Sequence, residues 1–387
     1  MKYKMCEVVE RVHGNVDRFN TDLKYFVAGE QFECREVTIK KKGLLTPKTV
    51  NLLGFKFHFP FKTGDVLFMA RSPHLRKAGM VTFDGICSDA SYILRTKNED
   101  ILMQRFLPFV VQSDLMWDYF DSHKTGSVNP LLNWKDFSQF EFELPPIEEQ
   151  RRTAILLWAI ERTRQAYRDL LVQTDELVKS QFVEMFGDPV DNPMNWPIKP
   201  LTSMGACKNG MNFHAGDSGV DINCLGVGDF KDYSIIDDTS KLPLVSLNAM
   251  PDSEYLLQDG DIVFVRSNGN KALVGRSVAV FPGKNPTTFS GFCIRFRLAD
   301  TTAVQMEYLL QVLKTESIRK KMQGRGANIQ NLNQQILSSL DIPLPPNDLQ
   351  EHFINFIKQT DKSKLAIRQS LESLEKSRNA IMKSIFG

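Results

Sequence analysis

The stretch of sequence that decides the fold is Leu144-Pro145-Pro146-Ile147-Glu148-Glu149-Gln150, which recurs as Leu344-Pro345-Pro346-Asn347-Asp348-Leu349-Gln350. The two copies lie 200 positions apart (344 − 144 = 200), and residues 124–187 align with residues 324–387 in this register without a gap. Both aligned segments end in Phe-Gly. This period is far longer than that of solenoid repeats, so each copy is expected to be a domain plus a connector.

The segments that follow the two proline pairs are predicted to be long helices. Proline is tolerated in the first turn of a helix, so Pro145-Pro146 and Pro345-Pro346 end a strand and open a helix. After each pair, apolar residues recur three and four positions apart, which is the period of one helical face. A helix of about 40 residues reaches on the order of 60 Å at 1.5 Å per residue.

A helix of that length with one apolar seam needs a partner. The simplest partner for each helix is the other, in an antiparallel coiled coil, because the two helices occupy equivalent ends of two copies. The alternative is that each helix caps its own domain. The shared register favours the paired arrangement.

The rest of the chain is predicted to consist of short strands with a few helices. The clearest strand patterns are at residues 55–59, 66–69, 91–94, 261–265, 277–280 and 292–296, and shorter helical patterns lie at about 100–120 and 304–322. The predicted fold class is α+β, with two globular domains separated by two long antiparallel coiled-coil helices in a pseudo-two-fold arrangement. The predicted boundaries are 1–145 for the first domain, 146–187 for the central helix, 188–345 for the second domain and 346–387 for the C-terminal helix.

Composition restricts the class of protein. The chain has 387 residues, 42% hydrophobic and 24% charged, which is ordinary for two globular domains. No apolar run approaches the roughly 20 residues of a membrane span, and the N-terminus has no signal-peptide pattern. Six scattered cysteines support neither a zinc site nor a disulfide framework, so a cytoplasmic location is expected. The net charge is only +2, so any nucleic-acid surface must concentrate its basic residues locally.

The sequence contains no recognisable catalytic motif. It lacks the glycine-rich loops that bind phosphates or dinucleotides, and its six histidines are isolated from one another. Neither Asn129-Pro130 nor Asn285-Pro286 is followed by the proline and aromatic residue that base-modifying amino-methyltransferases use. Catalytic residues, a cofactor and a metal are therefore not expected in this chain.

Basic and amide side chains do gather in loops. Arginine suits guanine edges, asparagine and glutamine suit adenine edges, and lysine and serine reach phosphates. A Gly-Asp turn and an apolar strand lead to Arg-Ser in both domains, at Gly64–Ser72 and Gly260–Ser267. The alternative is that these loops are simply solvated turns. The predicted DNA-binding residues are Lys40, Lys41, Lys42, Arg71, Ser72, His74, Arg76, Lys77, Lys124, Arg266, Ser267, Asn268, Asn270, Lys271, Arg276, Arg325 and Asn328.

This pattern resembles the DNA-specificity subunits of type I restriction-modification systems. Members have two target-recognition domains and two long helices, each introduced by Leu-Pro-Pro-x-x-x-Gln, as at Leu144–Gln150 and Leu344–Gln350. Leu177–Pro189 is similar to the end of the family's central helix, and Gly260–Gly269 resembles its recurring strand and DNA loop. The first domain departs from the pattern because it lacks the Asn-Trp-Pro lead-in that Asn195–Pro197 gives the second.

The resemblance implies a non-catalytic recognition subunit that binds double-stranded DNA with two different half-sites. It also implies that two methyltransferase subunits dock on the long helices and that restriction subunits join them. S-adenosylmethionine, ATP and Mg²⁺ would be bound by those partners, with none of them held by this chain. Two other readings remain: a coiled-coil scaffold whose domains bind proteins, and an enzyme that acts by itself.

Overall fold

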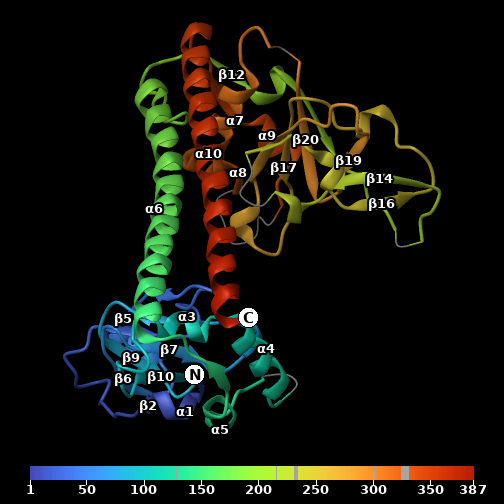
Figure 1. The fold of residues 1–387 in the computed structure, drawn as a ribbon. Coiled ribbons are helices and arrows are strands. Elements are labelled where there is room, and N and C mark those ends of the chain that lie inside the picture. The colour runs from blue at the N-terminus through green and yellow to red at the C-terminus, as the bar shows by residue number, and fades with distance from the viewer. Residues whose placement is uncertain (127–129, 215, 231–233, 300, 324–330) are drawn as a thin grey trace. The chain divides into compact units, whose positions relative to one another are not determined.

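The computed structural model describes residues 1–126, 130–214, 216–230, 234–299, 301–323 and 331–387. Figure 1 shows the ribbon coloured from the N-terminus to the C-terminus. The chain divides into two compact units, and each unit contains parts of both long helices. Unit 1 comprises Met1–Leu170 and Ile367–Gly387, and unit 2 comprises Leu171–Ala366. The domain boundaries predicted at residues 145, 187 and 345 remain predictions.

Two helices of 40 residues follow the proline pairs, as the sequence predicted. They are α6 (Ile147–Phe186) and α10 (Asn347–Phe386), whose first and last residues differ by the same 200 positions as the motifs. The glutamine of each motif fixes the start of its helix. Gln150 Nε2 donates to the carbonyl oxygens of Ile101 (2.8 Å) and Pro145 (3.0 Å), and its Oε1 accepts from Met103 N (3.2 Å). Gln350 repeats this pattern with Ala303, Pro345 and Gln305.

The described residues of unit 1 form three sheets. Their strand orders are β2-β10-β7-β8-β4, β5-β3-β9-β6 and β1-β11. The strands are β1 (Lys2–Lys4), β2 (Val9–Val12), β3 (Tyr25–Val27), β4 (Thr38–Ile39), β5 (Gly43–Leu44), β6 (Phe57–Phe61), β7 (Val66–Met69), β8 (Ala78–Val81), β9 (Gly85–Ser88), β10 (Ser91–Thr96) and β11 (Glu141–Glu143). The short helices are α1 (Met5–Val8), α2 (Pro47–Leu52), α3 (Leu107–Val111), α4 (Asp114–His123) and α5 (Trp134–Ser138).

In unit 2 the part of the chain that the structure describes forms three sheets of closely similar order, β13-β20-β17-β18-β15, β16-β14-β19 and β12-β21. The strands are β12 (Ile198–Pro200), β13 (Gly205–Asn209), β14 (Val220–Leu225), β15 (Ile235–Ile236), β16 (Leu244–Leu247), β17 (Asp261–Val265), β18 (Ser277–Val280), β19 (Thr287–Phe289), β20 (Cys293–Leu298) and β21 (Asp341–Pro343). The helices are α7 (Met306–Lys314), α8 (Glu316–Gln323) and α9 (Gln334–Ser338).

The pairings in the two five-stranded sheets match strand for strand. β7 and β17 each lie antiparallel between two neighbours, and β4 with β8 and β15 with β18 are parallel pairs. The aspartate of each Gly-Asp turn is buried against an arginine: Arg95 Nε lies 2.8 Å from Asp65 Oδ1, and Arg297 Nε lies 2.8 Å from Asp261 Oδ1. Similar sheets therefore support both predicted loop regions.

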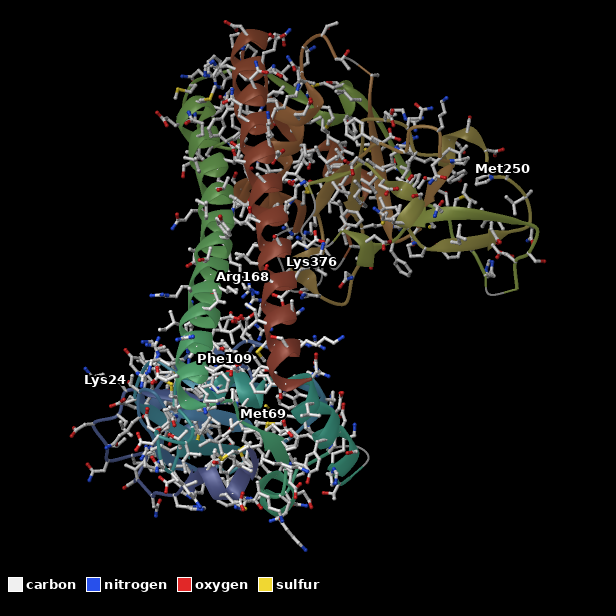
Figure 2. All side chains as sticks on the ribbon, in the orientation of Figure 1. Lys24, Met69, Phe109, Arg168, Met250 and Lys376 are labelled. Carbon is white, nitrogen blue, oxygen red and sulfur yellow. The ribbon has the colours of Figure 1, made fainter. Side chains whose placement is uncertain are left out.

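Each unit builds its core from the start of one long helix and the end of the other. In unit 1, Leu157 of α6 and Met382 of α10 belong to the same apolar cluster as the strands. In unit 2, Phe353 of α10 and Phe182 of α6 take the same places. Phe109 of α3, labelled in Figure 2, is fully buried, and its ring centroid lies 5.2 Å from that of Trp158 on α6.

The mixture of helices and sheets fits the predicted α+β class. β7, β17 and β18 have the predicted bounds, whereas β6 begins two residues later than predicted. Phe55 and Lys56 form a turn before that strand, and Phe55 is 79% exposed. None of the described helices combines the length and apolar character that crossing a bilayer requires.

Candidate nucleic-acid interface

In each unit the structure brings the turn after the central strand next to a segment about sixty residues further along the chain. In unit 1, the turn after β7 forms a bridge between Arg71 and Leu131, beside the segment that holds Lys124. In unit 2, the turn after β17 forms the equivalent bridge between Ser267 and Asn331. Gln323 Nε2 also donates to the carbonyl oxygen of Lys271 (3.5 Å). Segments separated by about sixty residues thus form one surface at the end of a central strand in each unit.

In the turn after β7, some of the predicted DNA-binding residues are exposed to solvent. Arg71 and His74 are exposed, and Ser72 and Arg76 have the left-handed φ values of 53° and 47° that non-glycine residues seldom adopt. Arg76 is held by Asp114 and Asp118 of α4, and its side chain is 18% exposed. Lys77 Nζ donates to the carbonyl oxygen of Gly29 (2.7 Å). Arg76 and Lys77 therefore brace the turn from within unit 1.

The predicted lysine run lies elsewhere, between the edge strands β4 and β5. Lys40, Lys41 and Lys42 are all exposed. Lys41 Nζ lies 2.8 Å from Glu33 Oε1, and Lys42 Nζ lies 3.8 Å from the ring centroid of Tyr25. A lysine over an aromatic face gains a modest attraction and keeps its charge at the surface.

The turn after β17 is organised by its amides. Asn268 Oδ1 accepts from Asn270 N (2.8 Å), and Asn270 Oδ1 accepts from Ala272 N (3.0 Å), which opens the 3₁₀ turn η6 (Lys271–Leu273). Arg266 is half-buried, and its Nη1 donates to the carbonyl oxygen of Gly291 (3.3 Å). The loop is therefore pre-shaped by its own side chains.

The arginines of the two Gly-Asp strands are not equivalent, contrary to the parallel that the sequence suggested. Ala70 N donates to Ala90 O and Ala70 O accepts from Leu132 N, whereas the same roles in unit 2 belong to Arg266, with Phe292 and Leu332. Ala70 is thus the counterpart of Arg266, and Arg71 is the counterpart of Ser267. Adjacent residues of an extended chain point to opposite faces, so the two arginines project differently.

The remaining predicted residues are placed as follows. Lys124 is exposed after α4, with Nζ 2.9 Å from Asp121 Oδ1. Lys271 is exposed in η6, and Arg276 is half-buried immediately before β18. Arg325 and Asn328 lie outside the described residues, so their assignment stays a prediction.

Sequence reasoning missed a set of cations that lines a hollow in unit 2 between α6, α7, α8 and η6. Lys314, Arg319 and Lys364 belong to it, together with the predicted residue Arg276. Burial lowers the pKa of Lys314 to about 8, and the charges of Lys364 and Arg276 act in the same direction against those of Asp361 and Asp175. The available signal was the lysine that ends the largely apolar segment Met306–Lys314.

Metal ligands do not gather in the part of the chain that the structure describes. Within it, no group of three or more histidine, cysteine, aspartate or glutamate side chains could hold a metal ion.

Comparison with known proteins gives one family. The family model described as type I restriction modification DNA specificity domain matches residues 18–169 and 231–376, which is more than half of the chain. The chain is 26% identical over 199 residues to a putative type I restriction enzyme MjaX specificity subunit of Methanocaldococcus jannaschii. That match covers 50% of this chain and 46% of the other protein, so the likeness takes in about half of the relative's length.

Two solved structures share the fold. One is a chain from a study of complex assembly and conformational transition of the type I R-M system, with a TM-score of 0.58, 18% identity and coverage of 100% of this chain and 97% of that one. The other is the type I restriction-modification system S subunit from M. genitalium, with a TM-score of 0.56, 13% identity and coverage of 100% and 96%. At such low sequence identities these structures show a similar fold only. The assignment of the chain to a family rests on the family model, which matches two segments of the chain. The protein belongs to the type I restriction modification DNA specificity domain family.

Proposed function

We propose that this chain is the DNA-specificity subunit of a type I restriction-modification system and that it reads a bipartite target in double-stranded DNA. One observation carries the proposal. The five-stranded sheets of the two units have matching orders, yet the loops that leave their matched strands carry different side chains, with Ala70 in one unit where Arg266 stands in the other. A common frame with different loops suits two half-sites of different sequence.

The long helices are proposed to act as a ruler between the two target-recognition domains. In unit 1 the start of α6 packs with the end of α10, and in unit 2 the end of α6 packs with the start of α10. In the first unit Arg378 Nε of α10 donates to Glu161 Oε1 of α6 (2.6 Å), and in the second the ring centroids of Phe182 on α6 and Phe353 on α10 lie 5.5 Å apart. These contacts support an antiparallel coiled coil with a pseudo-two-fold axis, which would present the two domains to DNA in opposite orientations.

The chemistry is proposed to belong to partner subunits. Two methyltransferase subunits would dock on the long helices, bind S-adenosylmethionine and methylate an adenine that leaves the base stack in each half-site. Restriction subunits would supply ATP- and Mg²⁺-dependent translocation and cleavage. The chain itself would work in the cytoplasm as a non-catalytic positioning subunit.

Co-expression with a type I methyltransferase subunit in a host without adenine methylation tests this function. Mapping of modified adenines is expected to give one motif with two different halves and an unread spacer. The control is the methyltransferase subunit alone, which should leave the motif unmodified. Exchange of residues 188–345 for the matching segment of a relative should change one half of the motif and keep the other. Methylation that does not depend on this chain would overturn the proposal, and the absence of any sequence preference would favour a scaffold.

A further inference from the structure

Unit 2 contains a hollow of about 970 Å³ whose lining has more basic than acidic side chains. It is bounded by the last turns of α6, the end of α7, α8, Lys364 of α10 and Ala272 of η6. The basic residues that line it are Lys179, Arg276, Lys314, Arg319, Lys320 and Lys364, and the acidic ones are Asp175, Glu176, Asp188 and Glu316. The lining therefore carries an excess of positive charge.

The acidic side chains are largely engaged with cations at the margin of the hollow. Lys364 Nζ lies 2.5 Å from Asp175 Oδ1. The pairs Lys179 with Glu176 and Lys320 with Glu316 are both 2.7 Å apart, and all four of these side chains are more than 60% exposed. Their charges consequently do little to balance the interior of the hollow.

Lys314 differs from these lysines. Among the described residues no carboxylate lies within 4.0 Å of its Nζ, although its side chain is half-buried beside Lys364 and Arg276. Arg319 is close by: its Nη2 donates to the carbonyl oxygens of Ala272 (2.6 Å) and Val274 (3.2 Å), and its buried Nε has no partner among the described residues. A cation held among other cations gains from an anion that enters from outside.

Unit 1 has a hollow of about 310 Å³ at the equivalent place. Arg378 and Met382 line it, 200 positions after Val178 and Phe182 of the hollow in unit 2 (378 − 178 = 200). Ser113 and Thr315 each donate to the carbonyl oxygen three residues earlier, immediately before α4 and α8, which makes Gln112 the counterpart of Lys314.

In unit 1 the residue at this position, Gln112, has a purely structural role. Its Nε2 donates to the carbonyl oxygens of Ala78 (2.5 Å) and Glu36 (3.1 Å), and its Oε1 accepts from Trp117 Nε1 (3.3 Å). Every polar atom of this side chain has a partner within unit 1. Lys314 has replaced a satisfied structural amide with a charge that has no counter-ion within ion-pair distance among the described residues.

We propose that the hollow of unit 2 is an anion site for a phosphate of the DNA backbone, with Lys314 as its central cation and Arg276 and Lys364 beside it. This inference rests on the proposed function. DNA is favoured over an acidic protein segment because the hollow shares Ala272 and Arg276 with the chain segment that continues directly from the loop at Arg266–Lys271. Phosphate contacts fix the register of a protein on the duplex and leave base reading to the neighbouring loop.

Binding of short duplexes to the full-length chain, alone and with its methyltransferase subunit, tests the site. One duplex carries the mapped target and the other has both half-sites scrambled. Lys314→Gln introduces the residue that unit 1 uses, and it is expected to weaken binding of both duplexes by a similar factor of roughly five to ten. The slope of log K against log salt should fall by about one, with the methylated motif unchanged. Lys314→Arg should keep the slope.

The matched control is Lys362→Gln, which removes the same charge from an exposed position of α10 outside the hollow. It should change affinity much less than Lys314→Gln. Equal effects of the two variants would overturn the site, as would an effect confined to the target duplex. Normal DNA binding by Lys314→Gln with weakened methyltransferase binding would assign the hollow to an acidic protein segment. If the unaltered chain shows no preference for the mapped target, the proposed function itself has failed.

Discussion

Arg378 donates a 2.6 Å hydrogen bond from Nε to Oε1 of Glu161, although 217 positions separate the two residues. Both side chains are less than a tenth exposed. Arg164 completes the group, with Nη1 2.5 Å from Glu161 Oε2 and Nη2 2.7 Å from Glu375 Oε2. The desolvation penalty of burying such charges offsets much of the free energy gained from their attraction. We therefore interpret this network as fixing how the end of α10 meets the start of α6 within unit 1.

Removal of one partner from this network should be costly. Arg378→Ala leaves Glu161 buried with Arg164 as its remaining partner, so the free energy of unfolding is expected to fall by about 3 kcal/mol, at the lower end of the range for broken buried pairs. Denaturation by urea, followed by tryptophan fluorescence, measures it, because Trp117, Trp134 and Trp158 all lie in unit 1. Lys376→Ala on the exposed side of α10 is the control, and an equal loss there would contradict the assignment.

The glutamines of the two motifs should contribute equally to stability. Gln150 is 1% exposed and Gln350 is 0% exposed, and each satisfies the same three backbone groups. Replacement of either by alanine leaves buried backbone groups without partners, which is expected to cost about 1–3 kcal/mol. Thermal melting of both variants, with Gln359→Ala at an exposed site of α10 as the comparison, tests this. A loss at only one of the two glutamines would refute the equivalence.

Arg266 and Arg71 should contribute to different kinds of contact. Arg266→Ala is expected to cost roughly 1–3 kcal/mol of binding free energy if the guanidinium reads a guanine, and to relax the motif in one half-site only. Arg71 stands at the position that Ser267 occupies in unit 2. Arg71→Ala is therefore expected to weaken DNA binding without relaxing the sequence of the other half-site. Methylome mapping and duplex titration distinguish these results. Unchanged affinity and an unchanged motif for Arg266→Ala would exclude it from base reading.

If the long helices set the distance between the two half-sites, the length of the unread spacer should change with the length of the helices. Deletion of seven residues from α6 and of the facing seven from α10 shortens each helix by about 10 Å, which corresponds to roughly three base pairs. Seven residues are close to two whole turns, so the apolar seam is nearly preserved. The mapped motif should keep both halves and lose about three positions of spacer. A shortened protein that methylates the original motif would show that the helices do not set the spacing.

Lys314 predicts a dependence of stability on pH. Burial, together with the charges of Lys364 and Arg276, lowers its pKa in the folded chain from 10.5 to about 8 against the opposing charges of Asp361 and Asp175. Between about pH 8 and 10.5 the unfolded chain therefore holds more protons at this group, so its contribution to stability rises with pH in that window. Lys314→Met should be more stable than the parent at pH 7, on the order of 1–3 kcal/mol, and lose this advantage near pH 10.5. Urea titrations at both pH values measure the difference in unfolding free energy between the variant and the parent. A difference that does not change with pH would contradict the prediction.

Local patterns were enough to predict the frame of this protein. Proline pairs and a period of three to four residues predicted α6 and α10, because the start of a helix and its apolar face depend on residues close together in the sequence. Gly-Asp turns before apolar runs predicted β7 and β17 with their observed bounds. Most strands of the smaller sheets were not predicted, since these sheets contain parallel pairs such as β3 with β9 and β14 with β19, whose partners are far apart in the sequence.

The candidate interface was predicted less completely. The loops at Arg71 and Arg266 were found from composition, but the one-residue offset that makes Ala70 the counterpart of Arg266 depends on hydrogen bonds to distant strands. Arg76 was predicted to face DNA, and the structure pairs it with Asp114 and Asp118 of α4. Lys314 was missed because its surroundings come from α6, α8 and α10 as well as from its own helix.

The sequence by itself determined two copies, two long helices and the family to which the chain belongs, since each of these is written in short motifs and in a fixed register of 200 positions. The tertiary structure alone decided which charges are already neutralised and which still lack a counter-ion. That difference arises because burial and ion pairing depend on residues brought together from distant parts of the chain. Its two clearest cases are Glu161 with Arg378, and Lys314, which has no carboxylate within 4.0 Å of its Nζ among the described residues.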